Sequence, residues 1–203
     1  MRLGILTFCL VLSCSARASL NSQSWSLSKG RKHSKFVFGK SLKDLEADVF
    51  SKKLSFQERW KLVSKVADLK KTQDAENFLM RCLESKEWFL QSAALKVLKK
   101  RNPELALYYA DQLLKRSGAL VVRSEAVEVV SELGGPAHTK ILWQALKQQT
   151  NFKGTRSLWI RPQIVKTIYK LERSNHSKKE WRFLLRDSDK KIKEMAKRVV
   201  ERF

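Results

Sequence analysis

The side chains best suited to catalysis are few and scattered in this sequence. The chain holds three histidines, His33, His138 and His176, and their spacing is not that of metal ligands. It contains no C-x-x-C pair, no glycine-rich phosphate loop and no H-E-x-x-H motif. With so few histidines, no Ser–His–Asp constellation can be assembled from the sequence. We therefore predict a non-enzymatic protein without a metal or cofactor.

The first 18 residues have the pattern of a secretory signal peptide. Arg2 precedes an apolar run at 3–12, and Ala16-Arg17-Ala18 forms an A-x-A site. The run is shorter than the about 20 residues of a membrane-spanning helix. We predict cleavage after Ala18 and export to the periplasm, the cell envelope or the medium. In the alternative, residues 11–14 serve as a lipobox and Cys14 carries the lipid, the one case in which we expect a membrane anchor.

Cleavage after Ala18 leaves Cys82 as the remaining cysteine, so no internal disulfide can form. Cys82 shares a helical face with Phe78, Leu79 and Leu83, which predicts a buried apolar role.

Positive charge dominates the composition. The chain holds 42 Lys and Arg against 20 Asp and Glu, a net charge of +22. Removal of residues 1–18 takes away Arg2 and Arg17 and no acid, which leaves +20. Such an excess attracts polyanions and steers acidic partners, unless it is only a generally basic surface. Residues 19–41 are rich in Ser and basic residues and predict a flexible arm.

Cationic residues also recur at a regular spacing. One column, with steps of 32, 32, 38 and 32 residues, consists of Arg59, Gln91, Arg123, Arg161 and Lys193. A second column lies five residues further on and consists of Lys96, Lys166 and Arg198, interrupted by Glu128. The basic residues of both columns are the candidate binding residues.

The elements that carry these columns are predicted to be helices in pairs. Apolar residues repeat at helical spacing, and no segment of useful length has strand periodicity. The expected first helices span 42–52, 73–84, 103–116, 136–149 and 177–186, and the second helices span 55–70, 86–101, 119–133, 157–173 and 188–202. Ser55 with Glu58 has the pattern of a capping box. The step of 38 residues between Arg123 and Arg161 is longer than the others because of six extra residues, 151–156, which we expect to form a loop. A repeat of this length predicts an all-α fold, an α-solenoid of about five hairpins.

Residues 42–203 resemble the HEAT-repeat family, especially its short bacterial form. The resemblance rests on Val122-Arg123-Ser124-Glu125-Ala126, with close versions at Ile160-Arg161 and at Ile192-Lys193 followed by Ala196. It implies a superhelix whose second helices line the concave face. An Asp often precedes the second helix in the family, and here Asp187 alone holds that place. The repeated Arg is then equally a binding residue or a structural ladder.

The chain holds six tryptophans, a residue type that often contacts ligands. Trp143 and Trp181 lie on apolar stripes and are predicted to be core residues. Trp88 and Trp159 stand at the start of second helices, where packing is favoured over ligand stacking.

Three functions fit these features. The first is an exported, non-catalytic scaffold whose concave face binds an acidic protein or an anionic envelope polymer. The alternative is a HEAT-like DNA-binding protein or an enzyme similar to alkylpurine DNA glycosylases, which requires an acidic residue between aromatic residues in the groove; export disfavours nucleic acid. The third is a protein held on a membrane surface by charge.

Overall fold

The computed structural model describes residues 41–69, 72–116, 118–172 and 177–202. All of them belong to one compact unit, Gly39–Phe203. The predictions for Cys14, the Ala18 cleavage site and the arm up to residue 40 lie outside the described residues. Ser41, assigned to the arm from the sequence, is instead the N-cap of the first helix.

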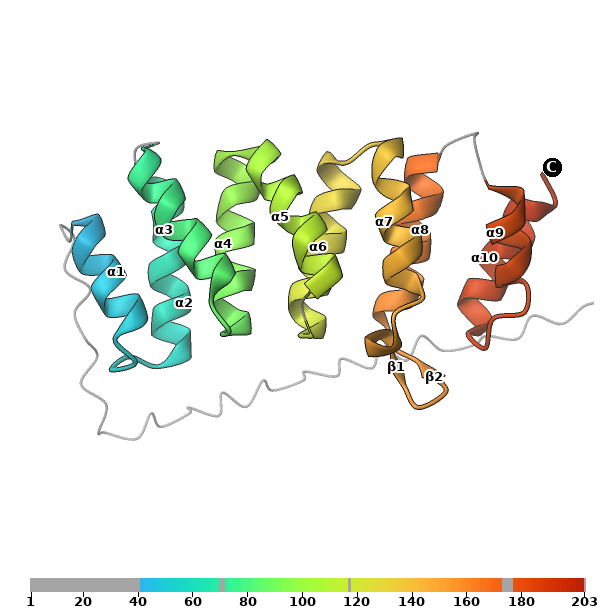
Figure 1. Cartoon of the computed structure of the whole chain (residues 1–203), viewed down its shortest axis with the longest axis horizontal. Helices are drawn as coiled ribbons and strands as arrows, with labels where there is room; N and C mark the ends of the chain where they lie inside the picture. Colours follow the sequence, from blue (N-terminus) through green and yellow to red (C-terminus); the bar gives the residue numbers. More distant parts are fainter. Residues whose placement is uncertain (1–40, 70–71, 117, 173–176, 203) are drawn as a thin grey trace, which may run out of the picture. The chain divides into compact units, whose positions relative to one another are not determined.

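The described chain is mostly helical, as the sequence predicts (Figure 1). The first helices of the five pairs are α1 Leu42–Phe50, α3 Gln73–Glu84, α5 Pro103–Arg116, α7 Thr139–Leu146 and α9 Lys178–Leu184. The second helices are α2 Phe56–Lys65, α4 Trp88–Arg101, α6 Leu120–Leu133, α8 Ile160–Glu172 and α10 Lys190–Val200. Three short 3₁₀ turns adjoin them: η1 Val66–Asp68, η2 Pro136–His138 and η3 Gln149–Asn151.

Consecutive helices pack as pairs, and each pair packs on its neighbours. Contacts join α1 to α2, α3 to α4, α5 to α6, α7 to α8 and α9 to α10. The second helices also form a row, because α4 contacts α2 and α6, and α8 contacts α6 and α10. Figure 1 shows the pairs following one another in chain order.

Side-chain caps explain where several helices begin. The predicted capping box at Ser55 and Glu58 is confirmed, and Ser41 and Asp44 form a second one at the start of α1. Asp189 accepts from two backbone N–H groups at the start of α10. Pro103 is the first residue of α5, where its missing N–H costs no helical hydrogen bond.

The core consists of the apolar stripes that the sequence predicts. Ala126 is fully buried, as are Ala94 and Ala196 at the equivalent places of α4 and α10. Cys82 is fully buried too, and burial raises the pKa of its thiol to about 12. Trp143 and Trp181 lie in the core with their ring centroids 5.7 Å apart in an edge-to-face contact. These predictions are confirmed.

Two predictions about the second helices are wrong in detail. Trp88 and Trp159 do not pack into the core: 46% and 56% of their surfaces remain exposed. The six extra residues are not only a loop, because Phe152–Lys153 and Arg156–Ser157 pair as the antiparallel strands β1 and β2. Gly154 makes this tight hairpin possible, because its φ of +62° is a conformation that other residues rarely adopt.

Candidate interaction surfaces

The first basic column lies mostly inside the protein. Arg59, Arg123 and Arg161 are 4%, 0% and 4% exposed, and each guanidinium reaches toward the turn of the following helix pair. We call these three residues the arginine ladder. A buried guanidinium needs hydrogen-bond partners for its donors, so the nature of each partner decides what the residue can do.

Arg59 binds both its own pair and the next one. Its Nε donates to the carbonyl of Val49, and its two terminal nitrogens bind the two carboxylate oxygens of Glu87, with a distance of 2.7 Å from Nη1 to Oε1. The hydrogen bonds from Arg59 hold the pKa of the Glu87 carboxyl below its ordinary value. Arg59 also lies over the ring of Phe89, 5.1 Å from its centroid.

Arg161 makes the same forked contact with Asp187. The distances are 3.0 Å from Nη1 to Oδ1 and 2.6 Å from Nη2 to Oδ2, and Nε donates to the carbonyl of Leu146. Burial alone would raise the pKa of Asp187. The hydrogen bonds from Arg161 and from the backbone N–H of Asp189 outweigh burial, so this pKa lies below its ordinary value.

Arg123 is held by neutral groups. It donates to the side-chain oxygen of Asn151 and, over 2.7 Å, to the hydroxyl of Thr150. Asn151 is itself fixed, because its amide donates to the carbonyl of Ala145. Burial without a carboxylate lowers the pKa of Arg123. Its Nε has no hydrogen-bond partner among the described residues.

The two remaining members of the column differ from the ladder. Gln91 donates to the carbonyl groups of Leu83 and Ser85, so it closes its own turn without a charge. Lys193 is exposed. Burial and internal partners support the structural alternative for Arg59, Arg123 and Arg161, and leave Lys193 as the accessible member.

The ladder partners Glu87 and Asn151 are not identified from the sequence. An Asp before the second helix, as the resemblance implies, is present in the sequence at Asp187 alone. The spacing itself could have found the others, because Arg59 and Glu87 are 28 residues apart, Arg123 and Asn151 also 28, and Arg161 and Asp187 26.

The second basic column is only partly free of internal partners. Lys96 lies 3.1 Å from the carboxylate of the buried Glu125 and forms an ion pair between α4 and α6. Burial raises the pKa of Glu125, and the contact with Lys96 opposes this effect only in part. Nearby, Lys99 Nζ binds Glu128 at 3.0 Å and Glu132 at 3.1 Å. Acids therefore balance the basic residues where α4 meets α6.

The balance is different on α8 and α10. Lys166 and Arg198 are exposed, and neither makes an ion pair within the described residues. Two neighbouring cations donate hydrogen bonds to neutral groups. Lys170 donates to the carbonyl of Ser131, and Arg202 donates to the hydroxyl of Tyr169. Positive charge therefore remains available at this end of the second-helix row. We call Lys166 and Arg198 the cationic pair.

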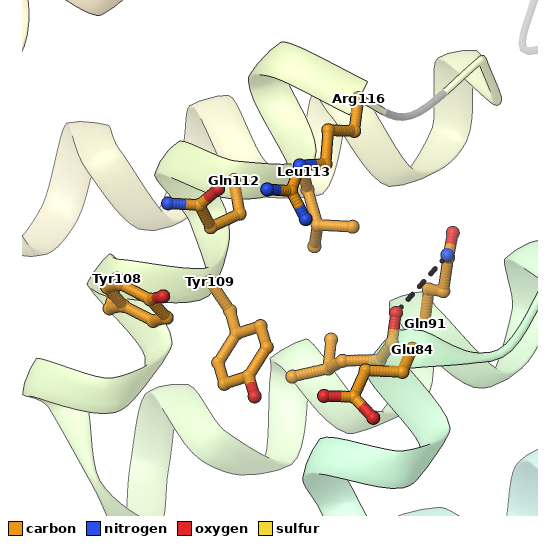
Figure 2. Close-up of a pocket in the computed structure, with 8 residues that line it drawn as sticks. Glu84, Gln91, Tyr108, Tyr109, Gln112, Leu113 and Arg116 are labelled. Atoms are coloured by element: carbon orange, nitrogen blue, oxygen red, sulfur yellow. Dashed lines mark hydrogen bonds between the residues drawn. The ribbon is translucent and has the colours of Figure 1, made fainter.

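A polar hollow of about 340 Å³ lies where α3, α4 and α5 meet (Figure 2). Tyr109, Glu84 and Arg116 line it, and Gln91 donates to the carbonyl of Leu83 at its edge. Burial and the charge of Glu84 raise the pKa of Tyr109, so its hydroxyl stays protonated at neutral pH. The hollow therefore offers polar groups that could form hydrogen bonds to a ligand.

A larger hollow of about 520 Å³ lies between α7 and α9. Its lining is basic, with one acid, Glu180, and an apolar patch at Phe183. The basic side chains are Lys147, Arg161, Lys179, Arg182 and Arg186. Of these, Arg161 already binds Asp187 as a member of the arginine ladder.

One acidic side chain lies between aromatic rings, as the glycosylase alternative requires. Glu172 is buried and accepts hydrogen bonds from the indole nitrogens of Trp143, over 2.8 Å, and Trp181, over 2.7 Å. Both carboxylate oxygens are thus engaged with core residues of the first-helix side. This geometry makes Glu172 a structural acceptor.

Comparison with known protein families, with curated proteins and with solved structures gave no match. Within the described residues, no three His, Cys, Asp or Glu side chains gather closely enough to hold a metal ion. None of the helices described combines the length and the apolar character needed to cross a membrane.

Proposed function

We propose that this chain is an exported, non-catalytic binding scaffold, a HEAT-like α-solenoid that binds an acidic protein or an anionic envelope polymer. The row of second helices, each in contact with the next, supports a repeat architecture. The arginine ladder supports it as well, because each of its members joins one helix pair to the next at an equivalent position. Extended surfaces of this kind are used for binding rather than for chemistry.

The exposed cationic pair carries the proposal. Lys166 and Arg198 occupy equivalent places on neighbouring second helices, where the acids found further along the row are missing. Their charge is available to a ligand because no described carboxylate neutralises it. The net charge of the chain, +22, adds long-range attraction for the same kind of ligand.

Binding to polyglutamate tests the proposal. Replacement of the cationic pair by alanine should weaken binding and reduce its dependence on salt, because fewer counterions are released. Lys96→Ala is the matched control, since Lys96 is already paired with Glu125. Binding that does not respond to salt, or that responds equally to both changes, would contradict the proposal.

The alternative is a DNA-directed protein, and the position of Glu172 between two tryptophans is its one favourable observation. Incubation with duplex DNA that contains an alkylated purine tests it. Base release that disappears in Glu172→Gln would favour the glycosylase. Sequence-independent binding to duplex DNA without base release would indicate attraction by charge alone and would contradict the glycosylase.

A further inference from the structure

Large apolar side chains that remain exposed gather at one edge of the helix row. This edge carries the turns that lead from each first helix to its second helix, and Figure 1 shows it as the lower edge, marked by β1 and β2. We call it the turn edge. It comprises residues 50–56, 85–88, 118–121, 147–159 and 183–191.

Most of the large apolar residues exposed in the described part of the chain belong to the turn edge. They are Phe50, Phe56, Trp88, Val121, Trp159, Phe183 and Leu185. Within the described ranges only two others are exposed to this degree: Leu69, at the opposite edge, and Tyr108, in the middle of α5. Phe183 is 68% exposed and Trp159 56%, although phenylalanine is among the residues most often buried.

These side chains recur from one helix pair to the next. Phe56, Trp88 and Val121 stand in the first turns of α2, α4 and α6, and Trp159 directly precedes α8. Phe56 and Trp88 are linked through Phe89, whose ring centroid lies 5.8 Å from that of Phe56 and 6.1 Å from that of Trp88. Because the helices lie in a row, these four groups follow one another along the turn edge, and Phe183 lies beyond them in the lining of the hollow between α7 and α9.

Basic residues accompany this apolar line. Exposed in the turns are Lys52, Lys53, Lys86, Lys147, Lys153, Arg156 and Arg186. The acids of the same turns are already engaged: Glu87 with Arg59, Asp187 with Arg161, and Asp189 with the first N–H groups of α10. The turn edge therefore presents apolar groups within an uncompensated positive field.

We propose that the turn edge docks on the surface of an anionic lipid bilayer, with its aromatic side chains in the headgroup region. Tryptophan prefers this region because its ring is apolar and its N–H can still bind water or a headgroup. Lys and Arg nearby are attracted to anionic headgroups, and their contributions add up along the edge. Docking of this kind requires no spanning helix and no lipid on Cys14.

Single-stranded nucleic acid is the competing ligand, since it also combines negative charge with aromatic stacking. The composition of the edge favours lipid. Val121 and Leu185 have no ring on which a base could stack, but they add apolar area to a bilayer contact.

Sedimentation with vesicles tests this inference. Vesicles of phosphatidylglycerol and phosphatidylcholine in equal parts are compared with vesicles of phosphatidylcholine alone. Both the full chain and the chain from Ser19 are used, because residues 3–12 are apolar enough to bind lipid by themselves. We expect the chain from Ser19 to bind the anionic vesicles and not to bind the neutral vesicles.

Two variants of the chain from Ser19 locate the contact. Trp88→Ser with Trp159→Ser should weaken vesicle binding by about tenfold or more, because two half-exposed indoles no longer leave water. The matched control is Tyr108→Ser, which removes an aromatic ring that is 58% exposed but lies away from the edge. Lys153→Glu with Arg156→Glu tests the charge of the β1–β2 hairpin and should also weaken binding, while the far-ultraviolet circular dichroism stays unchanged.

The outcomes separate this inference from the proposed scaffold function. Charge reversal of the cationic pair, Lys166→Glu with Arg198→Glu, should leave vesicle binding unchanged while it affects polyglutamate binding. The inference is overturned if the tryptophan variant binds vesicles as the parent chain does, or if the Tyr108 control loses as much. It is also overturned if the chain does not bind vesicles but binds a single-stranded oligonucleotide.

Discussion

At the scale of single residues, buried charges acquire their roles from the partner on the next helix pair. Arg161 faces a carboxylate, and Arg123 faces an amide and a hydroxyl, although both occupy the same place in the repeat. A buried guanidinium with a carboxylate partner is sensitive to the removal of that partner, because the remaining charge stays in a poorly solvated site. Glu87 and Asp187 are therefore the ladder residues whose protonation should weaken the fold, and Asp187 is the more deeply buried of the two.

Asp187→Asn should destabilise the chain by roughly 3–5 kcal/mol at neutral pH, the range for breaking one side of a buried ion pair. The pKa of Asp187 lies below its ordinary value of 3.8 in the folded chain, so its carboxylate stabilises the fold above that pH. This contribution is lost as the pH falls through the folded-state pKa. Urea denaturation at several pH values should show the difference between variant and parent narrowing in acid. A difference that does not change with pH would contradict the assignment.

Ala126 and Lys166 provide a second contrast between neighbouring columns. Ala126 is fully buried on α6, whereas Lys166 is exposed on α8. Ala126→Asp should cost several kcal/mol, because an unpaired carboxylate would be buried. Lys166→Ala should change the free energy of unfolding by less than about 0.5 kcal/mol. Melting curves of the two variants measure this contrast, and equal midpoints would be inconsistent with the repeat register.

At the scale of elements, the helix pairs are alike but their turns are not. The turn between α7 and α8 carries the β1–β2 hairpin and also holds Thr150 and Asn151, which bind Arg123. An insertion of a few residues thus lies beside a ladder contact. The conformation of the hairpin and the fixing of Arg123 are therefore expected to depend on each other.

Gly154→Ala tests this dependence. An L-residue in the left-handed conformation costs about 1–2 kcal/mol, so the variant should be destabilised by about that amount. Gly118→Ala is the control, because a Cβ there meets no atom within 4 Å and φ is not in the left-handed range. That control should be neutral or slightly stabilising. Chemical denaturation compares the two, and a stable Gly154→Ala variant would mean that the hairpin can rearrange freely.

At the scale of the whole molecule, the described helices contact their neighbours in the chain rather than a common centre. α10 packs on α8 and α9, and its outward residues are charged, among them Lys193 and Lys197. Contacts made mainly between adjacent helix pairs are typical of repeat arrays. Stability should then be nearly additive over the pairs.

Truncation after Glu172 should remove α9 and α10 without unfolding the rest. Helical content measured by circular dichroism should fall by about the share of the removed helices, and the melting temperature should drop because Trp143 loses its contact with Trp181. Truncation after Arg101, which removes α5 to α10, is the comparison with a larger part of the chain missing. Complete unfolding of the chain that ends at Glu172 would indicate one indivisible core instead of a repeat array.

The sequence by itself determined the helices, their pairing and the faces they bury. These follow from local information: the apolar period, the Ser55–Glu58 box, Pro103, and the repeat of Ala94, Ala126 and Ala196. The sequence predicts the burial of Cys82, Trp143 and Trp181 for the same reason, because each continues an apolar stripe of its own helix, and all three are buried.

Only the tertiary structure decided which charged and aromatic side chains remain available to a partner. Glu87, Asn151 and Glu125 lie 28 or 29 residues from the Arg59, Arg123 and Lys96 that they hold, and the sequence does not say which turn meets which helix. Trp88 and Trp159 were expected to pack, yet the helix ends leave them in solvent. Burial of a side chain at a helix end depends on how closely the neighbouring pair approaches, and no local pattern encodes that distance.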